Sequence, residues 1–441
     1  MSNTNSVKIA VVGTGYVGLV SGTCFASVGH DVVCIDNDAS KIEGLQRAEV
    51  ELPIYERGLD NLVKTSVDGS LLSFTTDLKK AVAESDVVFI AVGTPERKDN
   101  GQADLQYVHQ VAKEIGEAMN GYTVVVNKST VPIGTAEEVT AIINSVNPNA
   151  EFTVVSNPEF LREGVAINDF LHGDRVVVGV EDKRAQELMR QIYLPLSNNG
   201  MPVLSTAVKA AEMIKYASNT FLSIKLGFIN EMADLCEKLG VDVKEVAKGM
   251  GMDSRIGPKF LEAGPGFGGS CFPKDIKALE YIARQNVCDL SIVKATIESN
   301  VQRKIRMAEK VTSMFNGDVS GKNIAVLGLA FKGNTDDCRE SPAISIIQVL
   351  QEMGANIIAF DPAAMEESKH YVDNISYAED MYSVCDGADA LVILTEWEEF
   401  SNLNLNEVKK RLISPIIVDL RNMLKPEEVL AHGFKYQSIG R

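Results

Sequence analysis

The sequence lacks an apolar run of about twenty residues, the length that a membrane-spanning helix requires. Its first six residues are polar and do not resemble the apolar core of a signal peptide. Basic residues are also in deficit, because 43 Lys and Arg stand against 60 Asp and Glu, giving a formal net charge of −17. We therefore expect a cytoplasmic protein with neither a membrane nor a nucleic acid as partner.

Cysteine pairs of metal-binding or redox type are missing as well. No Cys-x-x-Cys occurs, which argues against a disulfide framework and against a zinc site, so we expect no metal. Most of the thiols should be buried, reduced and inert. The seven cysteines are Cys24, Cys34, Cys236, Cys271, Cys288, Cys338 and Cys385.

One cysteine lies in an unusual setting, the segment GFGGSCFPKD at residues 266–275. Pro273 suits the first position of a helix and good helix formers follow it, so Cys271 should lie just outside a helix N-terminus. The helix dipole and Lys274 would both favour a thiolate there, and the glycines would let a substrate approach the sulfur. The alternative is a glycine-rich turn that contains a small apolar residue.

A second motif opens the chain. Residues 7–12 predict a buried strand that runs into a GxGxxG turn at residues 13–18, then a helix over 19–28 and a strand over 31–35 that ends in Asp36. This order of elements is typical of dinucleotide binding, with the acid placed for the ribose hydroxyls. Asp36 would repel a 2′-phosphate, so the motif favours NAD over NADP. A glycine turn without a ligand is the alternative.

The first half of the chain continues to alternate strands with helices. The apolar strands at 86–92, 122–127, 152–156 and 175–179 predict a parallel sheet covered on both faces. Ligands gather at the carboxyl ends of such strands. The segments there are residues 93–95, 128–132 and 157–164.

The pattern then changes to one long helix from about residue 205 to 240, which suits a domain connector and a subunit interface. A second α/β unit begins near residue 321. We predict an α/β protein with two Rossmann-like, doubly wound parallel-sheet domains joined by a long central helix and a helical region. The expected domains are residues 1–204, which bind NAD, residues 205–310, which connect, dimerise and carry the Cys271 loop, and residues 311–441, which bind the substrate.

The second α/β unit lacks the dinucleotide glycine spacing and offers GLAFKG at residues 328–333 instead. We expect it to bind a different nucleotide or a phosphate, with Lys332 and Arg339 available for anionic oxygens. Solvated surface charge is the alternative for both.

Two pairs of polar residues have spacings that bring side chains together. Lys215 and Asn219 are four residues apart on the predicted long helix and can face one site; a lysine that extends to solvent beside a polar neighbour is the alternative. Residues 157–164 predict a short helix, capped by its asparagine and ended by its glycine, with Glu159 and Glu163 on one face. A solvated pair of acids is the ordinary alternative.

Together these motifs resemble the UDP-glucose/GDP-mannose dehydrogenase family over essentially the whole chain. The Cys271 loop, the turn at 129–132, the 157–164 segment, the Lys215 and Asn219 pair and the run at 331–341 occur in the order found in the family. Members that oxidise N-acetylated amino sugars usually have histidine where this chain has Ser270. Oxidisers of GDP-mannose commonly have leucine where it has Phe272.

The resemblance implies a four-electron oxidation of UDP-glucose to UDP-glucuronate with two NAD. Cys271 would form a thiohemiacetal and then a thioester, because an aldehyde does not readily give up a hydride whereas a tetrahedral thiohemiacetal does. GDP-mannose or a UDP-N-acetylhexosamine as substrate, or a non-catalytic NAD-binding regulatory protein, are the alternatives.

The resemblance also implies residue roles. Lys215 and Asn219 would stabilise oxyanion charge or hold a water, Glu159 would be the base for thioester hydrolysis, and Thr130 would position the water. Asp275 would assist proton transfer, or only cap its helix and orient Lys215. The implied substrate contacts are Phe160, Leu161, Lys215, Asn219, Arg255, Phe267, Gly268 and Lys332, with Arg255 reaching the neighbouring site of a homodimer. The implied cofactor contacts are Val12, Gly13, Gly15, Tyr16, Val17, Asp36, Lys41, Thr94, Ser129, Glu163 and Arg339.

Overall fold

The computed structural model describes residues 6–47, 52–97 and 101–441. The chain divides into two compact units, Met1–Ala217 and Ser218–Arg441. The predicted division into three domains, with boundaries after residues 204 and 310, stays a prediction.

The first unit is built on an eight-stranded sheet in the order β3-β2-β1-β4-β5-β6-β7-β8. Its apolar, Val-rich segments suit strands that are buried on both faces. Within the described residues β6 and β7 pair antiparallel, at Ser156 and Gly179, whereas the other neighbours pair in parallel. The strands are β1 (Lys8–Val12), β2 (Asp31–Ile35), β3 (Leu72–Thr75), β4 (Val87–Ile90), β5 (Thr123–Asn127), β6 (Phe152–Ser156), β7 (Val176–Gly179) and β8 (Val203–Thr206).

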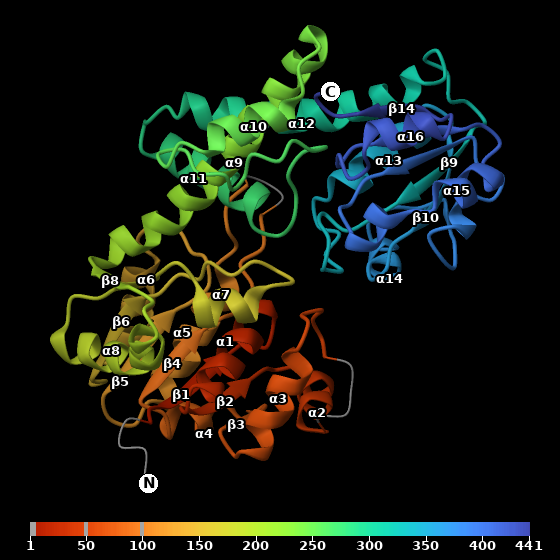
Figure 1. The fold of residues 1–441 in the computed structure, drawn as a ribbon. Coiled ribbons are helices and arrows are strands. Elements are labelled where there is room, and N and C mark those ends of the chain that lie inside the picture. The colour runs from red at the N-terminus through yellow and green to blue at the C-terminus, as the bar shows by residue number, and fades with distance from the viewer. Residues whose placement is uncertain (1–5, 48–51, 98–100) are drawn as a thin grey trace. The chain divides into compact units, whose positions relative to one another are not determined.

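Helices cover both faces of this sheet, as Figure 1 shows. One buried cluster joins the sheet to α1 (Tyr16–Ser27), α2 (Ala39–Arg47), α3 (Leu59–Asp68), α7 (Ala166–His172) and α8 (Lys183–Asn198). The other joins it to α4 (Leu78–Ala83), α5 (Gln106–Ala118) and α6 (Thr135–Val146). The predicted doubly covered sheet is confirmed.

A single helix, α9 (Val208–Leu239), follows the last strand. Its 32 residues span about 48 Å at the usual helical rise. The sequence predicted this helix from about residue 205, but residues 203–206 instead form the edge strand β8, which pairs with β7. The prediction was wrong at this end because pairing with a neighbouring strand is not visible in the local pattern.

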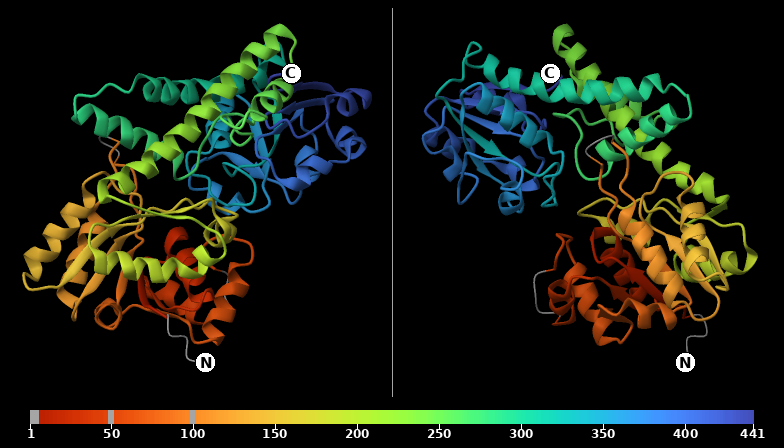
Figure 2. Two further views of the ribbon diagram at one scale, coloured as in Figure 1. Left: turned by 60° about the vertical axis from the view of Figure 1, so that its left-hand side comes forward. Right: turned by 180° about the vertical axis from the view of Figure 1, so that it is seen from behind.

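The second unit contains a six-stranded parallel sheet in the order β11-β10-β9-β12-β13-β14. Its strands are β9 (Asn323–Leu327), β10 (Asn356–Phe360), β11 (Ile375–Tyr377), β12 (Ala390–Ile393), β13 (Ile416–Asp419) and β14 (Lys435–Ser438). Its helices after α9 are α10 (Val243–Gly251), α11 (Phe272–Gln285), α12 (Ser291–Ser313), α13 (Pro342–Glu352), α14 (Met365–Ser368), α15 (Leu405–Arg411) and α16 (Pro426–Ala431). Figure 2 shows the strands and helices of each unit from two further sides.

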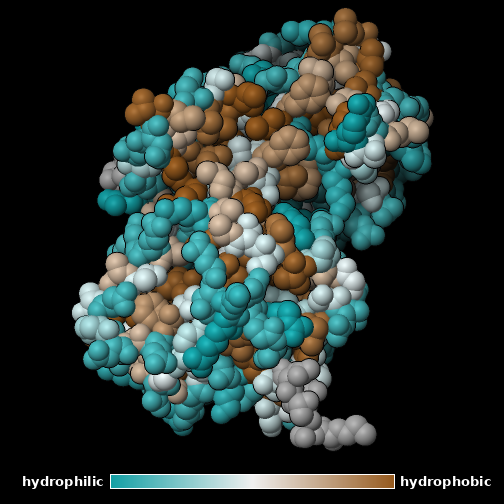
Figure 3. All heavy atoms as spheres, turned by 90° about the vertical axis from the view of Figure 1, so that its left-hand side faces the viewer, coloured by the Kyte–Doolittle hydropathy of each residue, from teal (hydrophilic) through white to brown (hydrophobic). Residues whose placement is uncertain are grey.

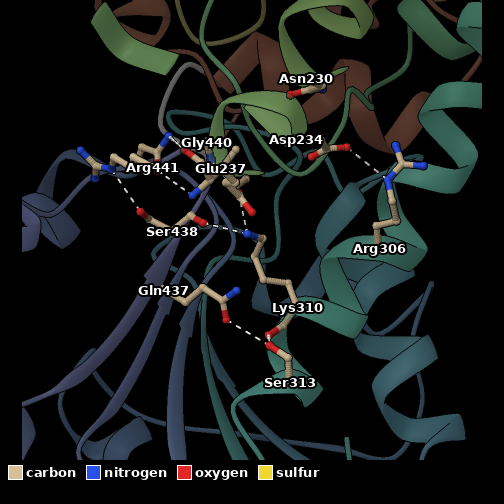
Figure 4. Close-up of polar contacts among 12 residues, drawn as sticks. Asn230, Asp234, Glu237, Arg306, Lys310, Ser313, Gln437, Ser438, Gly440 and Arg441 are labelled. Atoms are coloured by element: carbon tan, nitrogen blue, oxygen red, sulfur yellow. Dashed lines mark hydrogen bonds and ion pairs between the residues drawn. The ribbon is translucent and has the colours of Figure 1, made fainter. Parts of the chain in front are cut away.

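One buried cluster within the second unit includes residues of α9, α10, α12 and α13 together with its sheet. Polar contacts reinforce it where the last strand meets two helices (Figure 4). Lys310 of α12 donates to the Glu237 carboxylate of α9 at 2.6 Å and to the Ser438 carbonyl at 3.0 Å, and the Gly440 N–H donates to the same carboxylate. The helical region and the second sheet therefore share one buried core.

None of the helices in the described part of the chain is long and apolar enough to cross a membrane.

Candidate active site

The glycine-rich turn after β1 has the geometry of a dinucleotide crevice. Gly13 adopts a φ of +102° and its N–H donates to the Ile35 carbonyl at 2.7 Å. A side chain on Gly18 would begin 1.9 Å from the Gly13 carbonyl oxygen, so only glycine lets α1 pack against the turn. Gly15 is the N-cap of α1, and a Cβ there would meet nothing within 4 Å. The open space lies where helix N–H groups attract an anion, so these residues fit a pyrophosphate.

Asp36 lies at the end of β2, as predicted. Its carboxylate accepts hydrogen bonds from the N–H and hydroxyl of Thr14 at 2.9 and 2.6 Å, and Lys41 lies 3.6 Å away. Burial raises the pKa of Asp36, but the bonds from Thr14 and Asp38 and the Lys41 charge outweigh burial and hold this pKa below its usual value. Asp36 is therefore a fixed negative charge beside the crevice.

Two predicted cofactor residues connect neighbouring loops at the carboxyl edge of the sheet. The Thr94 hydroxyl donates to the Thr130 carbonyl at 3.0 Å, and the Ser129 hydroxyl donates to the Val92 carbonyl at 2.7 Å. The segments that follow β4 and β5 are thus held together where ligands of such sheets bind.

Tyr16 connects the crevice to the segment that carries Glu159. Its hydroxyl donates to the Glu56 carboxylate and accepts from the Gly164 N–H at 2.7 Å. Sequence reasoning missed Glu56, which is buried. Its position before the Gly58 turn and α3 gave no signal of that burial.

The predicted short helix over residues 157–164 is wrong, because this segment is irregular and α7 begins only at Ala166. The Asn157 side chain is used elsewhere, donating to the Val177 carbonyl at 2.7 Å instead of capping a helix. Glu159 accepts from the Leu161 N–H at 2.6 Å, which forms a local turn. Side-chain bonds to the backbone therefore replace the helical ones.

Glu159 and Lys215 form a buried ion pair in the first unit. Their charged atoms are 2.9 Å apart, and both side chains are about as buried as core residues. The Lys215 ammonium also lies 5.4 Å from the centre of the Phe160 ring, against whose face Arg175 stacks. Lys215 is therefore not a solvated lysine, and its role in a site stays a prediction.

Cys271 lies where the sequence predicted it, as the N-cap residue of α11 with a proline in the first turn. Its sulfur is 3.5 Å from the Ser270 hydroxyl. One turn further, buried Asp275 accepts from Asn219 of α9 at 2.6 Å and pairs with Lys274 at 2.6 Å. The charge of Lys274 is therefore shared with a carboxylate.

The glycines before Cys271 allow its loop to pack tightly against the segment after β9. A Cβ on Gly268 would lie 2.3 Å from the Glu340 carbonyl oxygen, and one on Gly269 would lie 2.8 Å from the Phe331 ring. The Asn300 amide of α12 clamps Phe267, accepting from its N–H and donating to its carbonyl at 2.9 and 3.0 Å. Sequence reasoning missed this clamp.

Lys332, Arg339 and Arg255 differ in their surroundings. The Lys332 ammonium lies 5.3 Å from the Phe331 ring centre, and Arg339 forms a two-pronged pair with Asp337 at 2.8 Å. Arg255 is highly exposed and pairs with Asp253 at 2.6 Å.

Sequence reasoning also missed Arg421, at the carboxyl end of β13. Its guanidinium donates to the carbonyls of Phe331 and Leu394 and so holds the Lys332 loop. The signal was available, because an arginine two residues after a buried strand lies at the ligand edge of such a sheet.

The second sheet repeats the turn of the first but fills it. The Gly328 N–H donates to the Phe360 carbonyl at 2.9 Å, as Gly13 does to Ile35. The acid after the second strand, Asp361, accepts from the Leu329 and Ala330 N–H groups and from the Trp397 indole at 3.1 Å. Because Asp361 is fully buried, unlike Asp36, and its carboxylate is used by Trp397 and the loop, this acid is not available for a ribose.

No group of three or more His, Cys, Asp or Glu side chains within residues 6–47, 52–97 and 101–441 is placed to hold a metal ion.

A dinucleotide crevice and a thiol at a helix N-terminus define a class of protein, an NAD-dependent dehydrogenase equipped with a candidate nucleophile. Residues 7–197 match the NAD binding domain of the UDP-glucose/GDP-mannose dehydrogenase family, residues 209–302 its central domain and residues 325–426 its UDP binding domain. The chain belongs to the UDP-glucose/GDP-mannose dehydrogenase family. The predicted family, fold class and cofactor are confirmed.

Relatives match over nearly the full length. The chain is 53% identical to a UDP-glucose 6-dehydrogenase of Rhizobium meliloti (strain 1021), covering 99% of this chain and 100% of the relative. It is 48% identical to UDP-glucose 6-dehydrogenase TuaD of Bacillus subtilis (strain 168), covering 98% and 93%.

Two solved structures also match this chain over nearly its full length. A UDP-glucose dehydrogenase from the archaeon Pyrobaculum islandicum matches with a TM-score of 0.91 at 37% identity, covering 99% of this chain and 98% of that one. A UDP-D-ManNAc dehydrogenase from Pyrococcus horikoshii matches with a TM-score of 0.86 at 29% identity, covering 98% and 99%. The fold is thus shared by enzymes that differ in their sugar.

Proposed function

We propose that this protein oxidises UDP-glucose to UDP-glucuronate and passes four electrons to two NAD. The observation that carries the proposal is the position of Cys271 at the start of α11, one turn before an aspartate bonded to Asn219. The names of the Rhizobium and Bacillus relatives support this choice of substrate, as does the match to a UDP binding domain.

The crevice residues would hold NAD, with Gly13 and Gly15 at the pyrophosphate and Asp36 at the ribose. Bound NAD supplies the hydride acceptor for both oxidation steps. The remaining proposed contacts are Val12, Tyr16, Val17, Lys41, Thr94, Ser129, Glu163 and Arg339.

Cys271 provides the covalent step. Its thiolate adds to the carbon of the aldehyde, which becomes tetrahedral, and the second oxidation leaves a thioester on the sulfur. Glu159 takes a proton from the water that hydrolyses this thioester, with Thr130 positioning the water. The products are the carboxylate and the regenerated thiol.

Lys215 and Asn219 stabilise the oxygen that gains negative charge. Both are buried, and stabilisation of an oxyanion in such surroundings contributes about 3 kcal/mol per donor. Asp275 orients Asn219 and pairs with Lys274. The proposed sugar and phosphate contacts are Phe160, Leu161, Phe267, Gly268 and Lys332.

We further propose that the chain forms a homodimer through α9, with Arg255 reaching the neighbouring site. Phe221, Phe228 and Leu235 are exposed and recur every seven residues, so they lie along one side of the helix. Leu239 extends this stripe. The face drawn in Figure 3 carries apolar patches (brown) among hydrophilic residues. Exposed apolar side chains aligned along one helix favour burial against a second copy.

The dimer is tested by molar mass in solution. Phe228→Asp should produce a monomer because it places a charge within the stripe, whereas Val287→Asp, at an exposed apolar position outside α9, should not. A dimer that survives Phe228→Asp would exclude this interface. We propose the cytoplasm as the location, because none of the seven cysteines forms a disulfide.

The reaction is tested by counting NADH formed per UDP-glucose consumed, where two supports the proposal and one contradicts it. Cys271→Ala should reduce UDP-glucuronate formation at least about a thousandfold, a scale seen when a nucleophile is removed. Cys288→Ala is the matched control, because Cys288 is an exposed thiol in the same unit.

Another sugar is the second candidate, favoured by the similarity to the Pyrococcus enzyme. Turnover of UDP-glucose, GDP-mannose and UDP-N-acetylmannosamine should be compared at equal concentration. A preference for either of the latter two would overturn the proposed substrate.

A further inference from the structure

Lys128 directly follows β5 at the ligand edge of the first sheet and has no role in the function proposed above. Its side chain is buried, with the residue only 5% exposed. The ammonium lies 5.9 Å from the ring centres of Phe170 and Tyr193, in aromatic surroundings. Lysine is almost never buried to this extent unless something pairs with it.

Its hydrogen-bond partners are neutral. The Lys128 ammonium donates to the Asn157 side-chain oxygen at 3.1 Å and to the Tyr193 hydroxyl at 3.3 Å, and Tyr193 donates to the same Asn157 oxygen. The Asn157 side-chain amide donates to the Val177 carbonyl, and the Asn157 backbone N–H donates to the Asn127 carbonyl. Asn157 is thereby fixed at every polar atom of its side chain.

Asn157 precedes Glu159 by two residues, so the cluster supports the backbone that carries the proposed base. Three titratable groups face Lys128: Glu159, Lys215 and Tyr193. Burial lowers the pKa of Lys128 to about 8, while the Glu159 charge raises it and the Lys215 charge lowers it. Lys128 is therefore coupled to the buried ion pair and is positively charged only below about pH 8.

We propose that Lys128 is a positioning residue for Glu159, because it holds Asn157, two residues before Glu159, in place. Turnover should therefore fall when Lys128 loses its proton and its bond to Asn157 weakens. The inference rests on the proposed function, since it concerns the base that hydrolyses the thioester. It predicts that the loss falls on this last step.

The test compares Lys128→Met, Lys128→Arg and Tyr193→Phe with the wild type in kcat and KM for UDP-glucose across pH. Lys128→Met should lower kcat about tenfold to a hundredfold, less than the roughly 10²–10⁴-fold that a general base itself contributes, with KM changed by less than about twofold. The variant should also accumulate a sugar adduct on Cys271, detected by intact-protein mass spectrometry, because hydrolysis becomes slow.

Lys128→Arg keeps the charge and should recover most of kcat while moving the alkaline fall in activity to higher pH. Tyr193→Phe removes a bond to Asn157 without removing charge and should leave the position of that fall unchanged. An unchanged kcat and pH profile in Lys128→Met, or an alkaline fall that does not move in Lys128→Arg, would overturn the inference.

The two proposals fail separately. If the wild type makes no UDP-glucuronate, the proposed function is wrong whatever Lys128 does. If the wild type does make it and the Lys128 variants behave like wild type, only the inference about Lys128 is wrong.

Discussion

Replacing Lys128 by methionine should make the first unit more stable at neutral pH. The wild type buries an ammonium against neutral acceptors and aromatic rings, and methionine has a similar length without the charge. Burial lowers the pKa of Lys128 from 10.5 to about 8. That difference corresponds to about 3 kcal/mol at a pH where the group is charged in both the folded and the unfolded chain.

Methionine also loses the two hydrogen bonds, which at about 1 kcal/mol each offsets about 2 kcal/mol, so the expected net gain is about 1 kcal/mol below pH 8. As pH rises from about 8 to about 10.5, the folded protein releases the Lys128 proton before the unfolded chain does. The unfolded state then binds more protons, so the free energy of unfolding of the wild type rises relative to that of the variant. The advantage of Lys128→Met should shrink over this window and then disappear.

Urea unfolding of both proteins at several pH values measures this difference. Far-UV circular dichroism follows both units, and the fluorescence of Trp397, the one tryptophan of the sequence, follows the second. Lys128→Arg is the control, because arginine keeps its charge throughout and should show no gain in stability. A Lys128→Met variant less stable than wild type near neutral pH, or a difference independent of pH, would refute the reasoning.

Three further changes test other parts of the structure. Asp36→Arg should weaken NAD and favour NADP, measured by the ratio of kcat/KM for the two cofactors; an unchanged ratio would exclude Asp36 from the ribose site. Gly268→Ala should lower kcat/KM at least about tenfold, because its Cβ would begin 2.3 Å from the Glu340 carbonyl oxygen; wild-type kinetics would show that the loop yields without cost. Trp397→Phe removes a hydrogen bond from buried Asp361 and should reduce the free energy of unfolding of the second unit by about 2 kcal/mol in urea titrations; an unaltered midpoint would contradict that bond.

The sequence predicted the parts of this molecule that short-range patterns specify. The GxGxxG turn between two strands and the proline after Cys271 each constrain only their neighbours, and both lie where they were expected. The long helix was also visible, because its pattern extends over many turns.

The remaining features depend on contacts between distant segments. Residues 157–164 carry helix-capping residues, yet Asn157 is engaged by Lys128 and Tyr193, which lie 29 and 36 positions away in the chain. The burial of Lys128 and the pairing of Lys215 with Glu159 arise in the same way. A local pattern contains no information about such partners.

The two sheets of this chain contain the same turn, but the turn of the second sheet is filled by the chain itself. Both halves keep the glycine bend and the acid after the second strand, but Asp36 accepts from Thr14 of its own turn, whereas Asp361 accepts from the indole of the distant Trp397. A coenzyme site engineered into the second sheet would therefore require removal of the Trp397 side chain and a new hydrogen-bond donor for the Asp361 carboxylate.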